Sequence, residues 1–303
     1  MKVKTKLLAL LLTALLLCGC AAGEETAAEP AAETPKPTVS IPSPPPPAEK
    51  REYEEAMVFF EGLLGGRAYV KDSVLYISPE SLAEHYGFQL RAELREDGFS
   101  LIAPELDMSG SYNADYMEAN GRYIYSPGRS LIVGGRLYLP EDVTEKVFGV
   151  NVTVFGEPVR AEISDAAPRF IEGGSNYYDI SFDTLDIYWL TQIIYAEARD
   201  EPMAGLIGVG NVVLSRVESE LYPDTVFDVI FEREPAVQFD PVFTGGIHEQ
   251  ADERSYIAAC LCLEGYNTVG ESLFFVNPVK GDATWVSENR EFVCSIGRHD
   301  FYA

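Results

Sequence analysis

Residues 183–217 read DTLDIYWLTQIIYAEARDEPMAGLIGVGNVVLSRV, and this stretch predicts two consecutive helices. Asp183 is a suitable N-cap for the first helix, because its carboxylate can accept hydrogen bonds from free N–H groups of the first turn. Pro202 is placed to begin the second helix. Large apolar residues cover most of the circumference of that second helix, so we expect it to be buried. Three glycines within it lower helix propensity and predict close contact with neighbouring elements.

Glu197 lies on the apolar side of the first helix. Leu190, Ile193 and Ile194 precede it by seven, four and three residues, and these spacings share one helix face. A carboxylate there is either a structural ion-pair partner, for instance of Arg199, or an acid whose pKa is raised. Burial disfavours the charged form, which keeps a glutamic acid protonated near neutrality and able to donate a proton. Periodicity alone leaves both interpretations open.

Shorter elements follow these two helices. Tyr256–Gly265 has a helical pattern, Leu273–Val276 is a compact strand candidate, and Trp285 lies in a turn-rich stretch. We therefore expect a helix-rich mixed domain over residues 183–303.

Three cysteines, Cys260, Cys262 and Cys294, remain outside the first twenty residues. They allow one disulfide at most, joining Cys294 to Cys260 or to Cys262. Residues two apart do not face each other on a helix, so Cys260 and Cys262 are poor mutual partners.

Residues 51–165 contain a twofold repeat of a β-hairpin followed by a short helix and a glycine. The strands and helix span residues 68–70, 74–77 and 78–86 in the first copy, and residues 131–133, 137–139 and 140–148 in the second. A further helix is predicted over Tyr53–Leu64, ended by Gly65 and Gly66. Together with the C-terminal region, this predicts an α+β protein with a small repeat-built N-terminal domain. Residues 166–182 are expected to connect the two domains.

The first fifty residues predict an export signal and a spacer. Three lysines precede the apolar run Leu7–Leu17, which is too short to span a bilayer. Leu17–Cys20 resembles a bacterial lipobox, which implies cleavage after residue 19 and a lipid anchor on Cys20. Residues 20–50 hold eight of the 19 prolines and almost no large apolar side chains, so we expect a Pro-rich disordered linker.

The charge and the histidine count exclude several classes of protein. The 303 residues include 23 Lys and Arg against 48 Asp and Glu, a net charge of −25, which argues against nucleic-acid binding. Three histidines and the lack of CxxC and HExxH motifs argue against a zinc enzyme. We expect no metal and no cofactor. Residues 183–303 alone carry 21 acidic and 7 basic side chains, so an uncharged or anionic polymer must be bound by stacking and hydrogen bonds.

Residues 194–199, IYAEAR, resemble the YAEARGE motif of the SleB/CwlJ family of cell wall hydrolases, known for spore-cortex lysis during germination. Further matches follow in the order of that family. They are VVLSRV at residues 212–217, PDTV at 223–226, QF at 238–239, FVNP at 275–278, Trp285, and the GxHxFY pattern of residues 297–302. The chain departs from the family at Asp200, where glycine is usual, and at Ser215, where asparagine is usual.

The resemblance implies cleavage of peptidoglycan glycan strands between muramic acid and glucosamine, with Glu197 as the catalytic acid. Germination enzymes of this family are lytic transglycosylases, in which one carboxyl acts first as acid and then as base. Hydrolysis instead needs a second carboxylate, for which Glu201 or Asp200 is nearest. A non-catalytic peptidoglycan-binding lipoprotein is the alternative function. In either case we expect the protein outside the cytoplasm, anchored by lipid at the outer face of the cell or spore membrane and facing the wall.

Seven residues of the matching segments are candidates for substrate binding. Amide and imidazole groups can hydrogen-bond to acetamido and hydroxyl groups, and aromatic rings can stack on sugar faces. Aromatic residues at these spacings pack a core equally well. The candidates are Tyr195, Gln238, Phe239, Asn277, Trp285, His299 and Tyr302.

The repeat in residues 51–165 resembles the N-terminal stalk-type domain first named in copper amine oxidases. Within this region His85 is the single histidine and there is no cysteine. A copper site needs more ligands than this, so we expect no copper chemistry.

Overall fold

The computed structural model describes residues 52–164, 168–174, 182–233, 239–279 and 283–303. The predicted signal peptide, the lipidation site Cys20, the Pro-rich linker and the candidate Gln238 lie outside these residues. No helix within the described ranges is long and apolar enough to cross a membrane.

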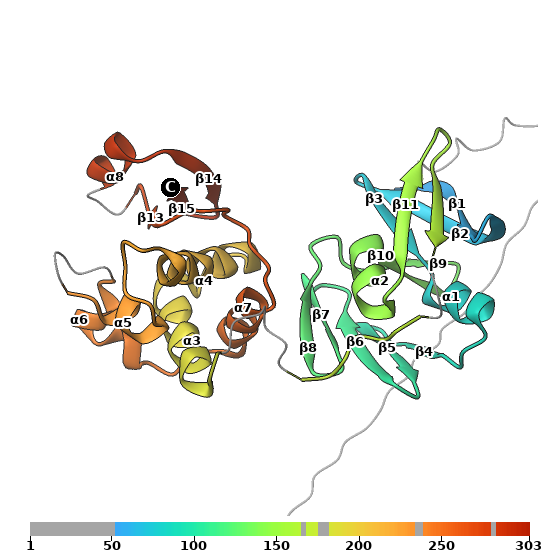
Figure 1. Cartoon of the computed structure of the whole chain (residues 1–303), viewed down its shortest axis with the longest axis horizontal. Helices are drawn as coiled ribbons and strands as arrows, with labels where there is room; N and C mark the ends of the chain where they lie inside the picture. Colours follow the sequence, from blue (N-terminus) through green and yellow to red (C-terminus); the bar gives the residue numbers. More distant parts are fainter. Residues whose placement is uncertain (1–51, 165–167, 175–181, 234–238, 280–282) are drawn as a thin grey trace, which may run out of the picture. The chain divides into compact units, whose positions relative to one another are not determined.

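The N-terminal domain contains two β-sheets (Figure 1). A seven-stranded sheet has the order β11-β12-β1-β2-β3-β10-β9, and a five-stranded antiparallel meander has the order β4-β5-β6-β7-β8. The strands of the larger sheet are β1 (Glu54–Phe60), β2 (Leu63–Lys71), β3 (Val74–Ile77), β9 (Leu131–Val133), β10 (Arg136–Pro140), β11 (Asn151–Phe155) and β12 (Arg160–Ser164). Those of the meander are β4 (Arg91–Leu94), β5 (Gly98–Ala103), β6 (Leu106–Ser111), β7 (Tyr116–Ala119) and β8 (Arg122–Tyr125).

The predicted repeat is confirmed by two hairpins, β2–β3 and β9–β10, each followed by a short helix. Helix α1 (Pro79–Tyr86) ends at Gly87 and helix α2 (Glu141–Phe148) ends at Gly149. Both glycines are left-handed, with φ of 74° and 61°, a conformation that favours residues without a Cβ atom. Strands β3 and β10 pair antiparallel, so the two copies of the repeat meet inside one sheet.

The helix predicted over Tyr53–Leu64 is wrong, because the chain forms strands β1 and β2 there. Ala56, Val58 and Phe60 are buried at every second position, which is the period of a strand. Strand β1 pairs with β2 on one side and, in parallel, with β12 on the other. These pairings, one with the next strand and one with a strand about a hundred residues later, outweigh the weak helical pattern of the segment.

The C-terminal domain packs helices against a small sheet of order β13-β15-β14, as the predicted helix-rich mixed domain requires. Together the two domains confirm the predicted α+β fold class. Trp285 lies on a helix, α8, and not in the turn-rich stretch that was predicted. The elements are α3 (Thr184–Ala198), α4 (Met203–Glu218), α5 (Val226–Phe231), α6 (Pro241–Thr244), a 3-10 helix (Gly246–His248), α7 (Glu253–Leu263), β13 (Phe274–Val276), α8 (Ala283–Asn289), β14 (Phe292–Ile296) and β15 (His299–Tyr302).

The glycines of α4 allow the close contacts that the sequence predicts. A Cβ atom on Gly210 would lie 2.6 Å from the sulfur of Cys262 on α7 and 2.9 Å from Ile194 on α3. A Cβ atom on Gly208 would lie 2.9 Å from Phe301 on β15. Helix α4 is therefore the central element, in contact with both neighbouring helices and with the sheet.

The cysteines of the C-terminal domain are all thiols, so the predicted disulfide of Cys294 with Cys260 or Cys262 is not formed. The thiol of Cys262 donates a hydrogen bond to the carbonyl of Ile207 at 3.3 Å. Burial raises the pKa of Cys262 strongly, which keeps it protonated and unreactive.

Candidate active site

Helix α3 begins with a reciprocal cap, as the sequence predicts. The backbone N–H groups of Leu185 and Asp186 donate to the Asp183 carboxylate at 2.7 and 3.0 Å. The N–H of Asp183 donates in return to the Asp186 carboxylate at 3.0 Å. This capping box fixes where the helix starts, and therefore which side chains lie on each face.

Glu197 lies in the last turn of α3, at the end of the apolar stripe that the sequence predicts. Leu190, Ile193 and Ile194 are completely buried, whereas Glu197 itself is only half-buried. The side chains of this stripe are therefore buried along the helix, and exposure to solvent begins at its last turn. The carboxyl group of Glu197 therefore follows a buried apolar stripe and is itself partly exposed.

Glu201 lies four residues further on, just before α4, in a very different environment. It is 4% exposed, and Arg298 donates to its two carboxylate oxygens, from the backbone N–H at 2.8 Å and from Nε at 2.7 Å. Burial alone would raise the pKa of Glu201. The hydrogen bonds from Arg298, together with the nearby charges of His299 and Arg298, outweigh burial and lower that pKa. Glu201 is therefore held as a carboxylate.

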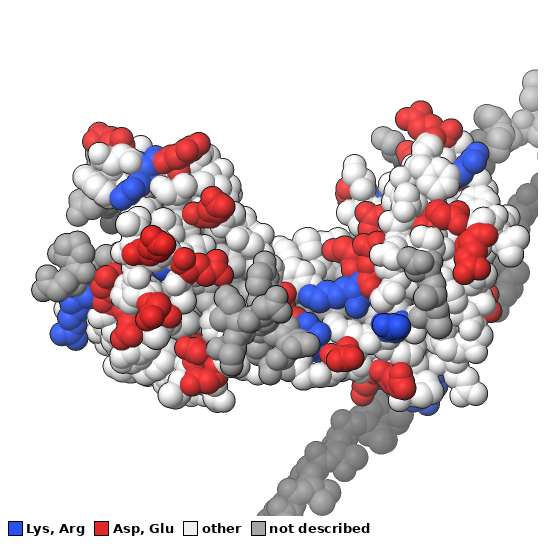
Figure 2. Space-filling view, viewed as in Figure 1, with Lys and Arg blue, Asp and Glu red and all other residues white. Residues whose placement is uncertain are grey.

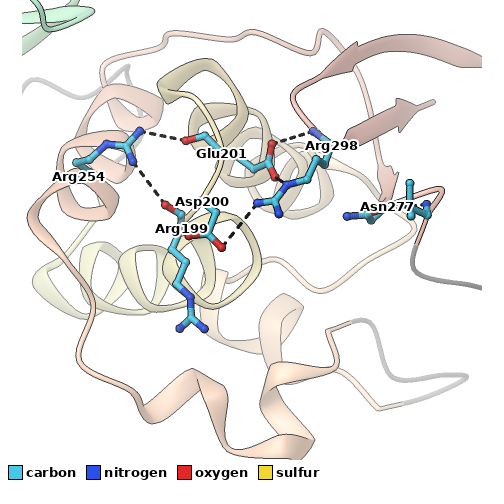
Figure 3. Close-up of polar contacts among 7 residues, drawn as sticks. Arg199, Asp200, Glu201, Arg254, Asn277 and Arg298 are labelled. Atoms are coloured by element: carbon cyan, nitrogen blue, oxygen red, sulfur yellow. Dashed lines mark hydrogen bonds and ion pairs between the residues drawn. The ribbon is translucent and has the colours of Figure 1, made fainter.

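Asp200, the departure from the family motif, lies beside the same arginine. Its side chain is 74% exposed, and its carboxylate is 3.7 Å from Nη2 of Arg298. Arg298 thus faces two consecutive carboxylates on the connection between α3 and α4 (Figure 3).

A second arginine, Arg254 of α7, holds the backbone of this connection (Figure 3). It donates to the carbonyl of Glu201 at 3.0 Å and to that of Arg199 at 3.5 Å. Arg199, proposed from the sequence as a partner of Glu197, forms an ion pair with Glu249 at 2.8 Å. Its guanidinium also lies over the ring of Tyr195, at 5.2 Å from the centroid.

The small sheet carries three of the predicted substrate-binding residues. Half-buried Asn277 follows β13, and its side-chain oxygen accepts a hydrogen bond from the N–H of Val279 at 3.1 Å. His299 and Tyr302 are both on β15 and both buried. The imidazole of His299 packs edge-on against Phe275 at 5.2 Å. Of these three, Asn277 is therefore the most accessible, whereas His299 and Tyr302 are buried.

Phe239 also lies in the core and not at a sugar-binding surface. It is 2% exposed, with the Arg216 guanidinium 5.1 Å from its ring centroid and Phe275 at 6.3 Å. Arg216 is itself buried, and its Nε donates to the carbonyl of Leu273 at 2.8 Å. Phe239 and Arg216 therefore join the end of α4 to the sheet.

The exposed aromatic candidate is Trp285 on α8. Its side chain is 57% exposed, and the guanidinium of Arg290 lies 5.5 Å from its ring centroid. Tyr195, on α3, is half-buried. Sequence reasoning missed Arg254 and Arg298, although Arg298 stands between the glycine and the histidine of the GxHxFY pattern.

The charge and the ligand chemistry of the surface limit what can bind. On the face shown in Figure 2, acidic side chains are spread over the described residues and basic ones are fewer. No group of three or more His, Cys, Asp or Glu within the described ranges could hold a metal ion. His85 of the N-terminal domain stacks on Phe60 with the ring centroids 4.5 Å apart, which is a packing contact.

Comparison with known proteins identifies relatives of the C-terminal domain. A family profile described as Cell Wall Hydrolase matches residues 200–302. The Spore cortex-lytic enzyme of Bacillus subtilis (strain 168) is 33% identical over 144 residues, which cover 48% of this chain and 44% of that protein. The enzyme of the same name from Oceanobacillus iheyensis is 34% identical over 116 residues, covering 38% of this chain and 41% of that protein. The chain thus matches less than half the length of these curated relatives.

Two solved structures are similar over nearly their whole length. The catalytic domain of the germination-specific lytic transglycosylase SleB from Bacillus anthracis is 31% identical, with a TM-score of 0.37, and the match covers 41% of this chain and 98% of that one. The catalytic domain of the Bacillus cereus SleB protein is 30% identical, with a TM-score of 0.38, and the match covers 43% of this chain and 99% of that one.

Proposed function

We propose that this chain cleaves the glycan strand of peptidoglycan, because residues 200–302 match the cell wall hydrolase family and the curated relatives of this region are named spore cortex-lytic enzymes. Half-buried Glu197 carries this proposal, because it follows the buried apolar stripe of α3 on the same helix face and is itself partly exposed. An apolar neighbourhood favours the protonated form of a carboxyl group, which is the form that a general acid needs.

In the proposed reaction Glu197 serves first as acid and then as base. Its proton passes to the oxygen between muramic acid and the next glucosamine, and the bond from C1 of muramic acid to that oxygen breaks. The glutamate then takes the proton of the muramic 6-hydroxyl as that oxygen bonds to C1. The products are a 1,6-anhydro-muramic end and a free glucosamine hydroxyl, with no water consumed and Glu197 protonated again.

The surroundings of Glu201 favour this one-carboxyl reaction over hydrolysis. A hydrolase needs a second carboxylate, either as nucleophile or as base for a water molecule. Both oxygens of Glu201 already accept hydrogen bonds from Arg298. Asp200 is largely exposed and faces the same arginine. The two alternatives that the sequence offers are therefore poor candidates for a second catalytic group.

Mass spectrometry of digested peptidoglycan tests the proposal. We expect wild-type protein to release muropeptides with anhydro-muramic ends from purified spore cortex, and Glu197→Gln to release none. If the released muropeptides instead carry reducing muramic ends, the reaction is hydrolysis and not transglycosylation. If the wild-type protein sediments with the wall and releases nothing, the chain is a peptidoglycan-binding lipoprotein instead. Cortex is the first substrate to test, because the curated relatives are named spore cortex-lytic enzymes.

We also propose that the protein is anchored by lipid on Cys20 and held at the outer face of the membrane. The lipobox-like order of Leu17–Cys20 and the Pro-rich residues 20–50 support this arrangement. The N-terminal domain would then act as a stalk, as its resemblance to the copper amine oxidase N-terminal domain suggests. Detergent phase separation tests the anchor: the wild-type protein should enter the detergent phase and Cys20→Ala the aqueous phase.

A further inference from the structure

The connection between α3 and α4 is held from two sides by arginines that lie far from it in the sequence. Arg254 comes from α7, and Arg298 comes from the turn between β14 and β15 (Figure 3). We propose that Arg298 is a positioning residue for Glu197, holding this connection in the arrangement that directs the Glu197 carboxyl toward the scissile bond. The inference rests on the proposed cleavage of glycan strands.

The contact between Arg298 and Glu201 is closely fitted. Two hydrogen bonds from one residue fix both the position and the rotation of the carboxylate. The turn also approaches Glu201 through Gly297, which has a φ of +59°. A Cβ atom at this glycine would lie 1.9 Å from Oε2 of Glu201. The close approach of Gly297 and the two hydrogen bonds from Arg298 therefore fix how this turn packs against the Glu201 carboxylate.

The geometry of the connection carries this constraint back to Glu197. Only residues 199–202 separate α3 from α4. Within them the N–H of Glu201 donates to the carbonyl of Ala198 at 2.8 Å, which ties Glu201 to the residue after Glu197. Arg254 binds the carbonyls of Arg199 and Glu201, and a cation there stabilises the negative end of the α3 dipole. A shift of Glu201 would therefore move the last turn of α3.

Asp200 makes Arg298 more important in this chain. A glycine at this position, as the family usually has, places no charge beside Glu201. Here Arg298 faces the carboxylates of both Asp200 and Glu201. Without Arg298, two neighbouring carboxylates would repel each other within four residues of Glu197, and the connection would rearrange to separate them.

Arginine is suited to this role because its planar guanidinium donates in fixed directions. Lysine keeps the positive charge, but it cannot reproduce the side-chain hydrogen bond in the same place while the backbone N–H also binds. The variants Arg298→Gln and Arg298→Lys therefore separate geometry from charge. Arg129→Gln is the matched control, because Arg129 forms a partly exposed ion pair with Asp115 in the N-terminal domain at 2.8 Å.

The test compares anhydro-muropeptide release, sedimentation with purified cortex, and hydrogen exchange of residues 190–202 in the full chain. We expect Arg298→Gln to lower the maximal release rate about 100-fold, the effect of a misplacement of about 1 Å, with binding to cortex within about twofold of wild type. Exchange at the amides of residues 195–201 should become about tenfold faster. Arg298→Lys should show the same loss of rate, and Arg129→Gln should match the wild type.

A folded Arg298→Gln variant with the wild-type release rate and wild-type exchange would overturn the inference. A parallel loss of rate and of binding would also overturn it, because that result indicates a general structural role. If Arg298→Gln does not fold, the same measurements on Arg298→Lys test the inference, because lysine keeps the positive charge beside Asp200 and Glu201. If the wild type releases no muropeptides, the proposed function fails, and hydrogen exchange still shows whether Arg298 holds the end of α3.

Discussion

The end of α3 and the start of α4 each present a glutamate, and the two are only four residues apart. Glu197 is half-buried at the end of an apolar stripe. Glu201 is buried and bound through both oxygens by Arg298. The pKa of Glu201 is lowered although this residue is buried.

Burial alone therefore does not decide which of the two glutamates can stay protonated and act as an acid. Burial raises the pKa of a carboxyl group, but a hydrogen-bonded cation lowers it by more. Glu201 consequently serves as a structural anion that joins the helix connection to the sheet. Glu197 shares a helix face with buried apolar residues and is only half-buried, which is the combination that suits proton transfer. Replacing each group in turn tests this division of roles.

The largest expected effect is that of Glu197→Gln on activity. Glutamine has the same shape but cannot donate or take a proton, so the rate of muropeptide release should fall by about a thousandfold or more. Thermal unfolding should stay within about 2 °C of wild type, because the half-buried side chain keeps its packing. A Gln variant that retains substantial activity would falsify the assignment of Glu197. Glu84→Gln, which affects an exposed ion pair with Arg136, should leave activity unchanged.

The next largest effect concerns the fit between Gly297 and Glu201. Gly297→Ala should lower the free energy of unfolding by about 2 kcal/mol, because it adds backbone strain and pushes on the buried carboxylate. Gly270→Ala is the matched control, since Gly270 has the same φ of 59° and no atom within 4 Å of its added Cβ. It should cost only the backbone strain, about 1 kcal/mol. Equal losses in urea titrations of the two variants would show that the turn is not fitted to Glu201.

A smaller loss is expected from Glu201→Gln. The variant keeps the shape of the side chain and loses its charge, which weakens the hydrogen bonds from Arg298. The free energy of unfolding should fall by about 1.5 kcal/mol, at the lower end of the range for charged hydrogen bonds because Arg298 is partly exposed. Glu84→Gln should cost less than about 0.5 kcal/mol. Similar losses for both variants, measured by urea unfolding, would make Glu201 an ordinary surface ion-pair residue.

The elements that the sequence predicts correctly depend on signals within a few residues. Asp183 caps α3 through its own first turn, and the helices of the repeat end at Gly87 and Gly149, which adopt a left-handed conformation. The apolar stripe that ends at Glu197 follows from helical spacing alone. Such signals lie within a few residues of one another, so these helix ends and this helix face can be predicted from the sequence.

Most of the differences between the expected and the observed structure involve partners that are distant in the sequence. The segment predicted as a helix near residue 54 forms strand β1, because β12 pairs with it about a hundred residues later. Arg298 is separated from Glu201 by 97 residues, and no spacing rule links the two. Phe239 and His299 are candidates for substrate binding that the sequence equally allows to pack a core, and in the structure both are buried beside Phe275. Sequence spacing identifies residues that lie near the site but does not show which way they face.

The smallest expected effect is the change with pH of the contribution that Glu201 makes to the free energy of unfolding. The pKa of Glu201 in the folded protein lies below its ordinary value of 4.5. The folded protein therefore binds fewer protons at this residue than the unfolded chain does, and its stability rises with pH across this range. The contribution should be complete above about pH 5 and should be lost as the pH falls through the folded-state pKa, below 4.5.

The difference in unfolding free energy between wild type and Glu201→Gln measures this contribution, because groups common to both proteins cancel. We expect the difference to be constant between about pH 7 and pH 5, and to shrink steadily at lower pH. A difference that grows on acidification would mean that Glu201 is protonated in the folded protein. Glu201 would then resemble the proposed acid Glu197, and the contrast between the two glutamates would rest on their accessibility rather than on their charge.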